Sequence, residues 1–157
     1  MITEKVNIRI TRVRRSLPLL PLPEIQTLGS SGYDLQADIE VPLTLLPGER
    51  VLVPTGIAVS VPPGFEAQIR PRSGLAMKHG VTIANAPGTV DSDYRGEIKV
   101  ILINLGQTAF MVQRSDRIAQ LVIQKIFHIH WNEVEALDTT ERATGGFGHT
   151  GVHLPTP

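Results

Sequence analysis

Two carboxylates in the middle of the chain have the residue type and spacing for acid–base chemistry. Asp91 and Asp93 lie in the stretch Gly88–Glu97, which follows Asn-Ala-Pro and therefore starts as a turn. Strand-forming residues flank this turn, so we expect a β-hairpin with both carboxylates and Tyr94 near its tip. Residues i and i+2 of an extended chain point to one face, and Tyr94 then points away from both carboxylates. One carboxylate could act as a base while the other binds a cation or an arginine; the alternative is that both only form the turn.

A second stretch has the composition of an anion site. The best helix candidate is residues 73–80, which Ser73 could cap and Gly80 could end. Arg72 comes directly before it. The free amides of a helix N-terminus, together with an arginine and a serine hydroxyl, can bind a phosphate. N-capping by Ser73 alone is the alternative, and it does not exclude anion binding.

Three further polar positions stand out along the chain. Asp34 lies beside a glycine turn, where it could be near a metal or could only cap the turn. Gln120 interrupts an apolar strand, a position that taken alone most often faces solvent. Phe147 lies in the glycine-rich segment Arg142–Gly151, where we expect a ring on a flexible loop to act as a lid over a planar ligand.

His128 and His130 are two possible metal ligands close together in the sequence. If both lie on a strand, two histidines at i and i+2 share a face. A zinc pair is conceivable, but no third ligand lies at a usual spacing, so we expect no metal there. For the neighbouring Trp131 we expect a place in the core or in a subunit interface.

The elements that must position these residues are short strands. Closely spaced Pro and Gly residues break the segment 33–65 into short apolar runs, a pattern typical of a β-sandwich or barrel. Further strands are expected over residues 6–13, 81–84, 97–105, 108–112 and 118–129. The three prolines of residues 17–23 predict an extended connector. We expect an all-β, jelly-roll-like sandwich or barrel over residues 1–137, with one short helix and a flexible C-terminal arm over 138–157.

Composition narrows the class of protein. The chain has 157 residues, enough for one domain with its own core. It contains no cysteine, which excludes a disulfide framework and a thiolate nucleophile. Because the sequence also shows no signal-peptide pattern, we expect a cytoplasmic protein. Its formal net charge is +0, so bulk electrostatics favour neither nucleic acid nor a membrane surface as a partner.

Taken together and in this order, the polar stretches resemble those of the trimeric deoxyuridine triphosphate nucleotidohydrolases (dUTPases). The resemblance extends from Gly32 to Gly151 and rests on five blocks, residues 30–37, 70–76, 85–97, 114–121 and 142–151. It implies a β jelly roll that assembles as a homotrimer with three active sites at subunit interfaces. It also implies Mg²⁺-assisted hydrolysis of dUTP to dUMP and pyrophosphate, which limits uracil in DNA and supplies dUMP for thymidylate synthesis.

The resemblance also implies roles for individual residues. Asp91 would be the general base that activates water, and Tyr94 would lie against the deoxyribose. Asp34 would support the Mg²⁺ site through water, with phosphate oxygens as the direct ligands. The substrate-binding residues would be Arg72, Ser73 and Gly74 on phosphates; Asn85, Thr89 and Val90 on uracil; Gln120 beside the phosphates and the water; and Arg142, Phe147, Gly148, His149 and Thr150 in the closing arm. His149 departs from the family pattern, in which many members carry serine.

Two alternatives stay open from the sequence. One is a dCTP deaminase, or a bifunctional deaminase and dUTPase, because these enzymes resemble dUTPases in fold. The other is a trimeric β module without enzymatic activity, which would leave the five polar blocks without a shared purpose.

Overall fold

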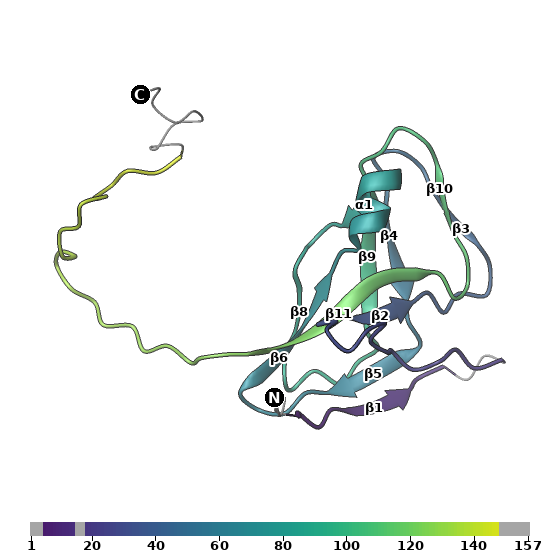
Figure 1. Ribbon diagram of the computed structural model, residues 1–157, viewed down its shortest axis with the longest axis horizontal. Coiled ribbons are helices and arrows are strands. Elements are labelled where there is room, and N and C mark those ends of the chain that lie inside the picture. Colours follow the sequence, from purple (N-terminus) through teal and green to yellow (C-terminus); the bar gives the residue numbers. More distant parts are fainter. Residues whose placement is uncertain (1–4, 15–17, 148–157) are drawn as a thin grey trace. The chain divides into compact units, whose positions relative to one another are not determined.

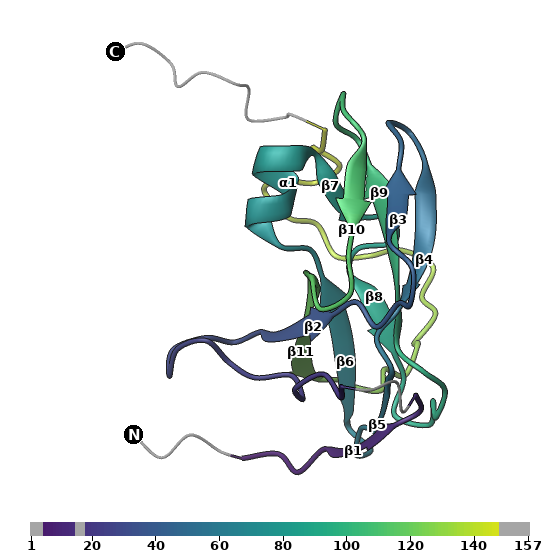
Figure 2. The same ribbon diagram turned by 90° about the vertical axis from the view of Figure 1, so that its right-hand side faces the viewer.

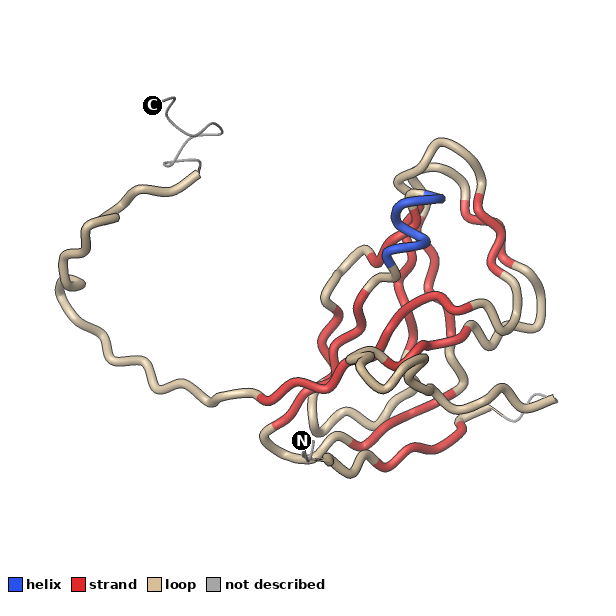
Figure 3. Tube along the Cα trace, in the orientation of Figure 1, coloured by secondary structure: helices blue, strands red, loops and turns tan. Residues whose placement is uncertain are grey.

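The computed structural model describes residues 5–14 and 18–147, and by its contacts the chain divides into a unit that ends at Phe127 and a unit that begins at His128. Its elements are β1 (Arg9–Arg12), β2 (Tyr33–Gln36), β3 (Leu43–Leu45), β4 (Arg50–Pro54), β5 (Ile57–Ser60), β6 (Phe65–Arg70), α1 (Ser73–His79), β7 (Val81–Ile83), β8 (Gly88–Val90), β9 (Lys99–Asn104), β10 (Phe110–Val112) and β11 (Arg117–Lys125) (Figure 1). All of them belong to the first unit. The expected all-β class with one short helix is confirmed for the described residues (Figure 3).

The strands form open antiparallel sheets. A four-stranded sheet has the order β2-β11-β6-β8, and a three-stranded sheet has the order β4-β9-β7. Strand pairs β1-β5 and β10-β3 complete the described set, and Figure 2 shows β10 beside β3. This arrangement is the sandwich of the expected jelly-roll class, and no closed barrel occurs among the described strands.

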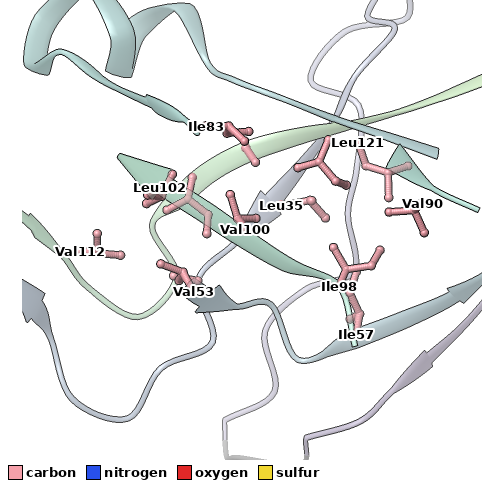
Figure 4. Close-up of a cluster of buried hydrophobic side chains, with 14 of the residues drawn as sticks. Leu35, Val53, Ile57, Ile83, Val90, Ile98, Val100, Leu102, Val112 and Leu121 are labelled. Carbon is pink, nitrogen blue, oxygen red and sulfur yellow. The ribbon is translucent and has the colours of Figure 1, made fainter. Parts of the chain in front are cut away.

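The core lies between the two larger sheets, as the alternation of their strands requires. In β9, buried residues alternate with more exposed ones, and Val100 and Leu102 point inward. They meet Leu35 and Leu121, which come from β2 and β11 of the other sheet (Figure 4). Period-2 patterns on both sheets thus bury one face of each, which fixes the register of the strands that carry the polar site residues.

The expected hairpin around Asp91 is wrong. Strand β8 pairs with β6, whereas β9 pairs with β4 and β7, so the segment between β8 and β9 crosses from one sheet to the other. The backbone amide of Tyr94 donates to the carbonyl of Asp91 at 3.2 Å, so Asp91 and Asp93 lie in a turn and not on extended chain. The carboxylates therefore do not have the common face that the hairpin predicted.

The helix is where the sequence predicted it, but its cap is different. Arg72 is the N-cap residue, with extended backbone angles (φ −96, ψ 124) and no side-chain cap hydrogen bond, and Ser73 is the first helical residue. Capping by Ser73 is therefore wrong. Gly80 ends the helix in the left-handed conformation at φ 68, and its amide donates to the carbonyls of Ala76 and Leu75.

The last strand is shorter than expected. β11 ends at Lys125, and residues 126–147 contain neither helix nor strand (Figure 3). His128 and His130 therefore do not share a strand face. Trp131 has 84% of its surface exposed, so the expected place in the core is wrong and a subunit interface stays a prediction. Among the described residues no helix has the length and apolar character needed to span a membrane.

Candidate active site

A buried carboxylate organises one group of the predicted site residues. Asp34, on β2, is only 6% exposed. The Nε of Arg72 lies 3.2 Å from its Oδ1, and the Nη1 of Arg117 lies 3.2 Å from its Oδ2. The side chain of Gln120 donates to Oδ1 at 3.4 Å. Because a buried charge is costly unless it is paired, this carboxylate holds both guanidinium groups in place.

Strand register explains why these residues meet. Gln120 on β11 lies opposite Asp34 on β2 and opposite Arg70 on β6, so the three side chains lie in one row across the sheet. Arg72 follows two residues after the end of β6 and also donates from Nη1 to the carbonyl of Arg117 at 3.1 Å. Arg72 is thereby fixed beside the exposed residues Ser73 and Gly74 in the first turn of α1.

Gly32 makes room for Gln120. A Cβ atom at position 32 would lie 3.1 Å from both Cβ and Cδ of Gln120, closer than most real contacts of this kind. A side chain at position 32 would push the Gln120 amide away from Asp34. Gln120 is thus not a free side chain in solvent, since it is half-buried and paired with Asp34.

A second group of predicted residues lines a separate pocket of about 370 Å³. Thr89, Val90, Asp91 and Tyr94 contribute to its wall. The remaining lining residues are Leu52, Glu97, Ile98, Lys99 and Ile101. Asp91 is exposed at the end of β8, and Tyr94 is 46% exposed. A wall that combines aliphatic side chains with an exposed carboxylate and a phenol ring suits a planar ligand whose reacting group lies near the carboxylate.

Asn85 is not part of the lining of this pocket. It is exposed in the turn between β7 and β8, where the cis peptide bond Ala86–Pro87 also occurs. A Cβ atom on Gly88 would lie 3.3 Å from the Asn85 amide nitrogen. Glycine at position 88 thus lets the Asn85 amide pack against the start of β8.

The structure does not bring the two groups together within one chain. Val90 pairs with Ala67 on β6, so Asp91 lies one residue beyond that row, away from Arg70. About four strand residues, or roughly 13 Å, therefore separate the Asp91 backbone from the Arg70 row, and Arg72 lies further away. The carboxylate pocket and the arginine group are two separate groups of residues in this chain.

The arm residues are described only in part. Arg142 donates from Nε to the carbonyl of Gly145 at 2.8 Å, and the Phe147 ring is fully exposed. Gly148, His149 and Thr150 lie outside the described residues. Their predicted roles, with those of Arg142 and Phe147, stay predictions.

Sequence inspection missed Arg117 as a site residue. It lies three residues before Gln120, and in a regular strand such residues point to opposite faces. The pairing of β11 with β2 shifts register between Arg117 and Ala119, which brings both side chains to Asp34. The only available signal was the presence of Arg117 in the same polar block as Gln120.

Comparisons with known proteins agree with this architecture. A family model described as dUTPase matches residues 20–151. A curated relative from Rickettsia bellii (strain OSU 85-389), named deoxyuridine 5'-triphosphate nucleotidohydrolase, is 59% identical over 133 residues, which cover 85% of this chain and 89% of the relative.

Two solved structures have the same fold. A mutant dUTPase of Staphylococcus bacteriophage 80alpha with dUpNHpp superimposes with a TM-score of 0.82 at 23% identity, covering 94% of this chain and 100% of the other. A mutant dUTPase from phage phi11 of S. aureus, described for its coordination of a structural Mg(II) ion, has a TM-score of 0.73 at 21% identity and covers 83% of this chain and 98% of the other. At these identities the two structures support the fold alone. Since the family model spans most of the chain and the R. bellii relative is alike over nearly its whole length, this chain belongs to the dUTPase family.

Proposed function

We propose that this chain hydrolyses dUTP to dUMP and pyrophosphate through attack of water on the α-phosphate. Family membership and the name of the R. bellii relative support this reaction. One observation carries the assignment to residues: Asp91 and Tyr94 line the same pocket as Thr89 and Val90. In this proposal the pocket takes the deoxyuridine, with Asn85, Thr89 and Val90 around the uracil.

Asp91 is the proposed general base. A base must come within hydrogen-bond reach of the proton that it takes, and an exposed carboxylate at the pocket wall can meet a water molecule beside a bound phosphate. Phosphoryl transfer depends mainly on positioning and on stabilisation of charge, so no nucleophilic side chain is required.

The arginine group is the proposed phosphate site. Arg72 presents a guanidinium beside Ser73 and Gly74, and guanidinium groups bind phosphate oxygens with two parallel hydrogen bonds. A Cβ atom on Gly74 would meet nothing within 4 Å, so space is open above this turn. The ion pair with Asp34 holds the Arg72 side chain in position, and Gln120 binds the same carboxylate.

Mg²⁺ is the proposed cofactor. Among residues 5–14 and 18–147 no three His, Asp or Glu residues form a group that could hold a metal ion, and both oxygens of Asp34 already meet cationic or amide partners. The residues therefore suit an ion held mainly by phosphate oxygens and water, as Mg²⁺ often is, with Asp34 at most in contact through water. Mg²⁺ bound with the substrate would neutralise phosphate charge.

We also propose that the active enzyme is a homotrimer. The two groups of residues are separate in one chain, and an active site completed by another subunit would bring a carboxylate pocket and an arginine group to one nucleotide. The C-terminal arm over residues 138–157, with Arg142 and Phe147 through Thr150, would then close over a site.

The cytoplasmic location stays a prediction from the sequence.

A substrate panel tests the proposed reaction. Pyrophosphate release is measured with dUTP, dTTP, dCTP and UTP, and ammonia release is measured with dCTP. We expect pyrophosphate from dUTP with strong preference and no ammonia from dCTP. Ammonia from dCTP would instead support the deaminase alternative, and no turnover of any nucleotide by a folded trimer would support a binding module.

The ring of Tyr94 is predicted to select the sugar. A ring packed on C2′ leaves a ribose hydroxyl desolvated without a partner, at a cost of about 1–3 kcal/mol, or roughly 10–100-fold. Tyr94→Ala is therefore expected to narrow the ratio of kcat/KM for dUTP over UTP, mainly through loss of activity on dUTP.

The control is Tyr94→Phe, which keeps the ring but removes the hydroxyl that donates to the carbonyl of Glu97 at 3.1 Å. It should keep most of the selectivity. Melting curves of both variants separate sugar selection from packing, because a pure packing role would lower stability and both activities together. An unchanged ratio in a stable Tyr94→Ala protein would exclude the sugar role.

A further inference from the structure

Gly96 lies closer to the ring of Tyr94 than any side chain would permit. A Cβ atom at position 96 would lie 2.5 Å from Cζ and 3.0 Å from Cε2 of Tyr94, and it would also overlap the Tyr94 hydroxyl oxygen. Real Cβ atoms essentially never approach another heavy atom within 3.0 Å. Any residue other than glycine at position 96 must therefore displace the ring or the backbone.

The backbone itself does not require glycine at this position. The described glycines with positive φ are Gly48, Gly56, Gly64 and Gly80, and Gly96 is not among them. Glycine in the left-handed region would be needed for conformational reasons. At position 96 the requirement comes from the adjacent ring.

Hydrogen bonds within the same segment also fix the ring and its backbone. The hydroxyl of Tyr94 donates to the carbonyl of Glu97, and Arg95 donates from Nη1 to the carbonyls of Ser92 at 2.6 Å and Tyr94 at 2.7 Å. The ring is thus folded back over the residues that follow it. Its remaining surface contributes to the pocket that Asp91 also lines.

Glu97 anchors this segment to the sandwich. Its side chain is only 13% exposed, and its Oε1 accepts from the amide of Gly56 at 3.0 Å and from Nε of Arg14 at 3.2 Å. The following amide, that of Ile98, donates to the carbonyl of Ile57 at 2.9 Å. Position 96 therefore lies between the anchored Glu97 and the ring. The overlap of a new Cβ atom with the ring would be relieved most readily by movement of the half-exposed ring.

We propose that Gly96 is a specificity-determining positioning residue: the absence of a side chain there seats the Tyr94 ring at the depth at which it excludes a ribose hydroxyl. This inference rests on the proposed dUTP hydrolysis and on the sugar role of Tyr94. Gly96 acts through Tyr94 and does not itself line the pocket.

A double-mutant cycle of Tyr94→Ala and Gly96→Ala tests the proposal, with kcat/KM for dUTP and UTP and a melting curve for each protein. Gly96→Ala alone should lower the dUTP/UTP ratio by about 10-fold, the lower end of the cost of an unpaired buried hydroxyl. In the Tyr94→Ala background, Gly96→Ala should change the dUTP/UTP ratio by less than about 2-fold, because the ring that the new Cβ atom would displace is absent. Gly29→Ala is the matched control, since a Cβ atom there meets nothing within 4 Å.

Other outcomes overturn the proposal. They are an unchanged ratio in a folded, dUTP-hydrolysing Gly96→Ala protein, or equal effects of Gly96→Ala with and without the Tyr94 ring. If Gly96→Ala alone does not fold, the double variant decides: a melting temperature equal to that of Tyr94→Ala supports the contact, and an unfolded double variant contradicts it. Failure of the proposed function is distinguishable, because wild type would then not hydrolyse dUTP.

Discussion

Asp91→Asn is expected to lower kcat for dUTP by about 10²–10⁴-fold, the range that general acid–base catalysis typically contributes. The asparagine has nearly the same shape but cannot take a proton from water. Asp91 is exposed at the end of β8, so the melting temperature should stay close to that of wild type. Steady-state kinetics and a melting curve on the same preparation measure both quantities.

Asp93→Asn is the matched control for this prediction. Asp93 is exposed in the same turn, but it is not among the residues that line the pocket. Its substitution should therefore change kcat far less than that of Asp91. Near-normal turnover by a folded Asp91→Asn protein would remove Asp91 from the role of general base.

Removal of the arm should have an effect of similar size. A chain truncated after Thr140 lacks Arg142 and Phe147, and it is expected to assemble as wild type does but to be nearly inactive. The reason is that the proposed arm excludes water and adds phosphate contacts only when the site is occupied. Size-exclusion chromatography and pyrophosphate release from dUTP measure assembly and activity.

Mixed assemblies show whether the arm acts on another subunit. Co-expression of the truncated chain with full-length Asp91→Asn gives trimers in which an intact Asp91 and an intact arm can meet only across subunits. We expect recovery of part of the wild-type activity. A control in which the truncated chain also carries Asp91→Asn should stay inactive. Mixed trimers as inactive as both parents would show that the arm serves its own subunit.

The fold class was predictable because it depends on local signals. Pro and Gly residues divide the chain into short apolar runs, and Gly80 ends helix α1. Strand pairing is not local, which is why the hairpin at Asp91 was predicted wrongly. The same turn and strand residues also fit a crossing between two sheets, as observed between β8 and β9.

The site was predictable by residue type more than by geometry. The pocket of Asp91 and Tyr94 and the group of Asp34, Arg72 and Gln120 contain residues that the sequence singled out. Arg117 was missed because a register shift reverses the face that its spacing predicts. Ser73 was expected as a cap, but Arg72 takes the cap position while its side chain pairs with Asp34.

The most direct test of dUTP hydrolysis by attack of water on the α-phosphate is the position of the oxygen taken from water. Wild-type protein is incubated with dUTP and Mg²⁺ in water enriched in ¹⁸O, and mass spectrometry follows the products. We predict dUMP and pyrophosphate as the only products, with the label in the phosphate of dUMP. Label in pyrophosphate, release of inorganic phosphate, or no reaction would contradict the proposed mechanism.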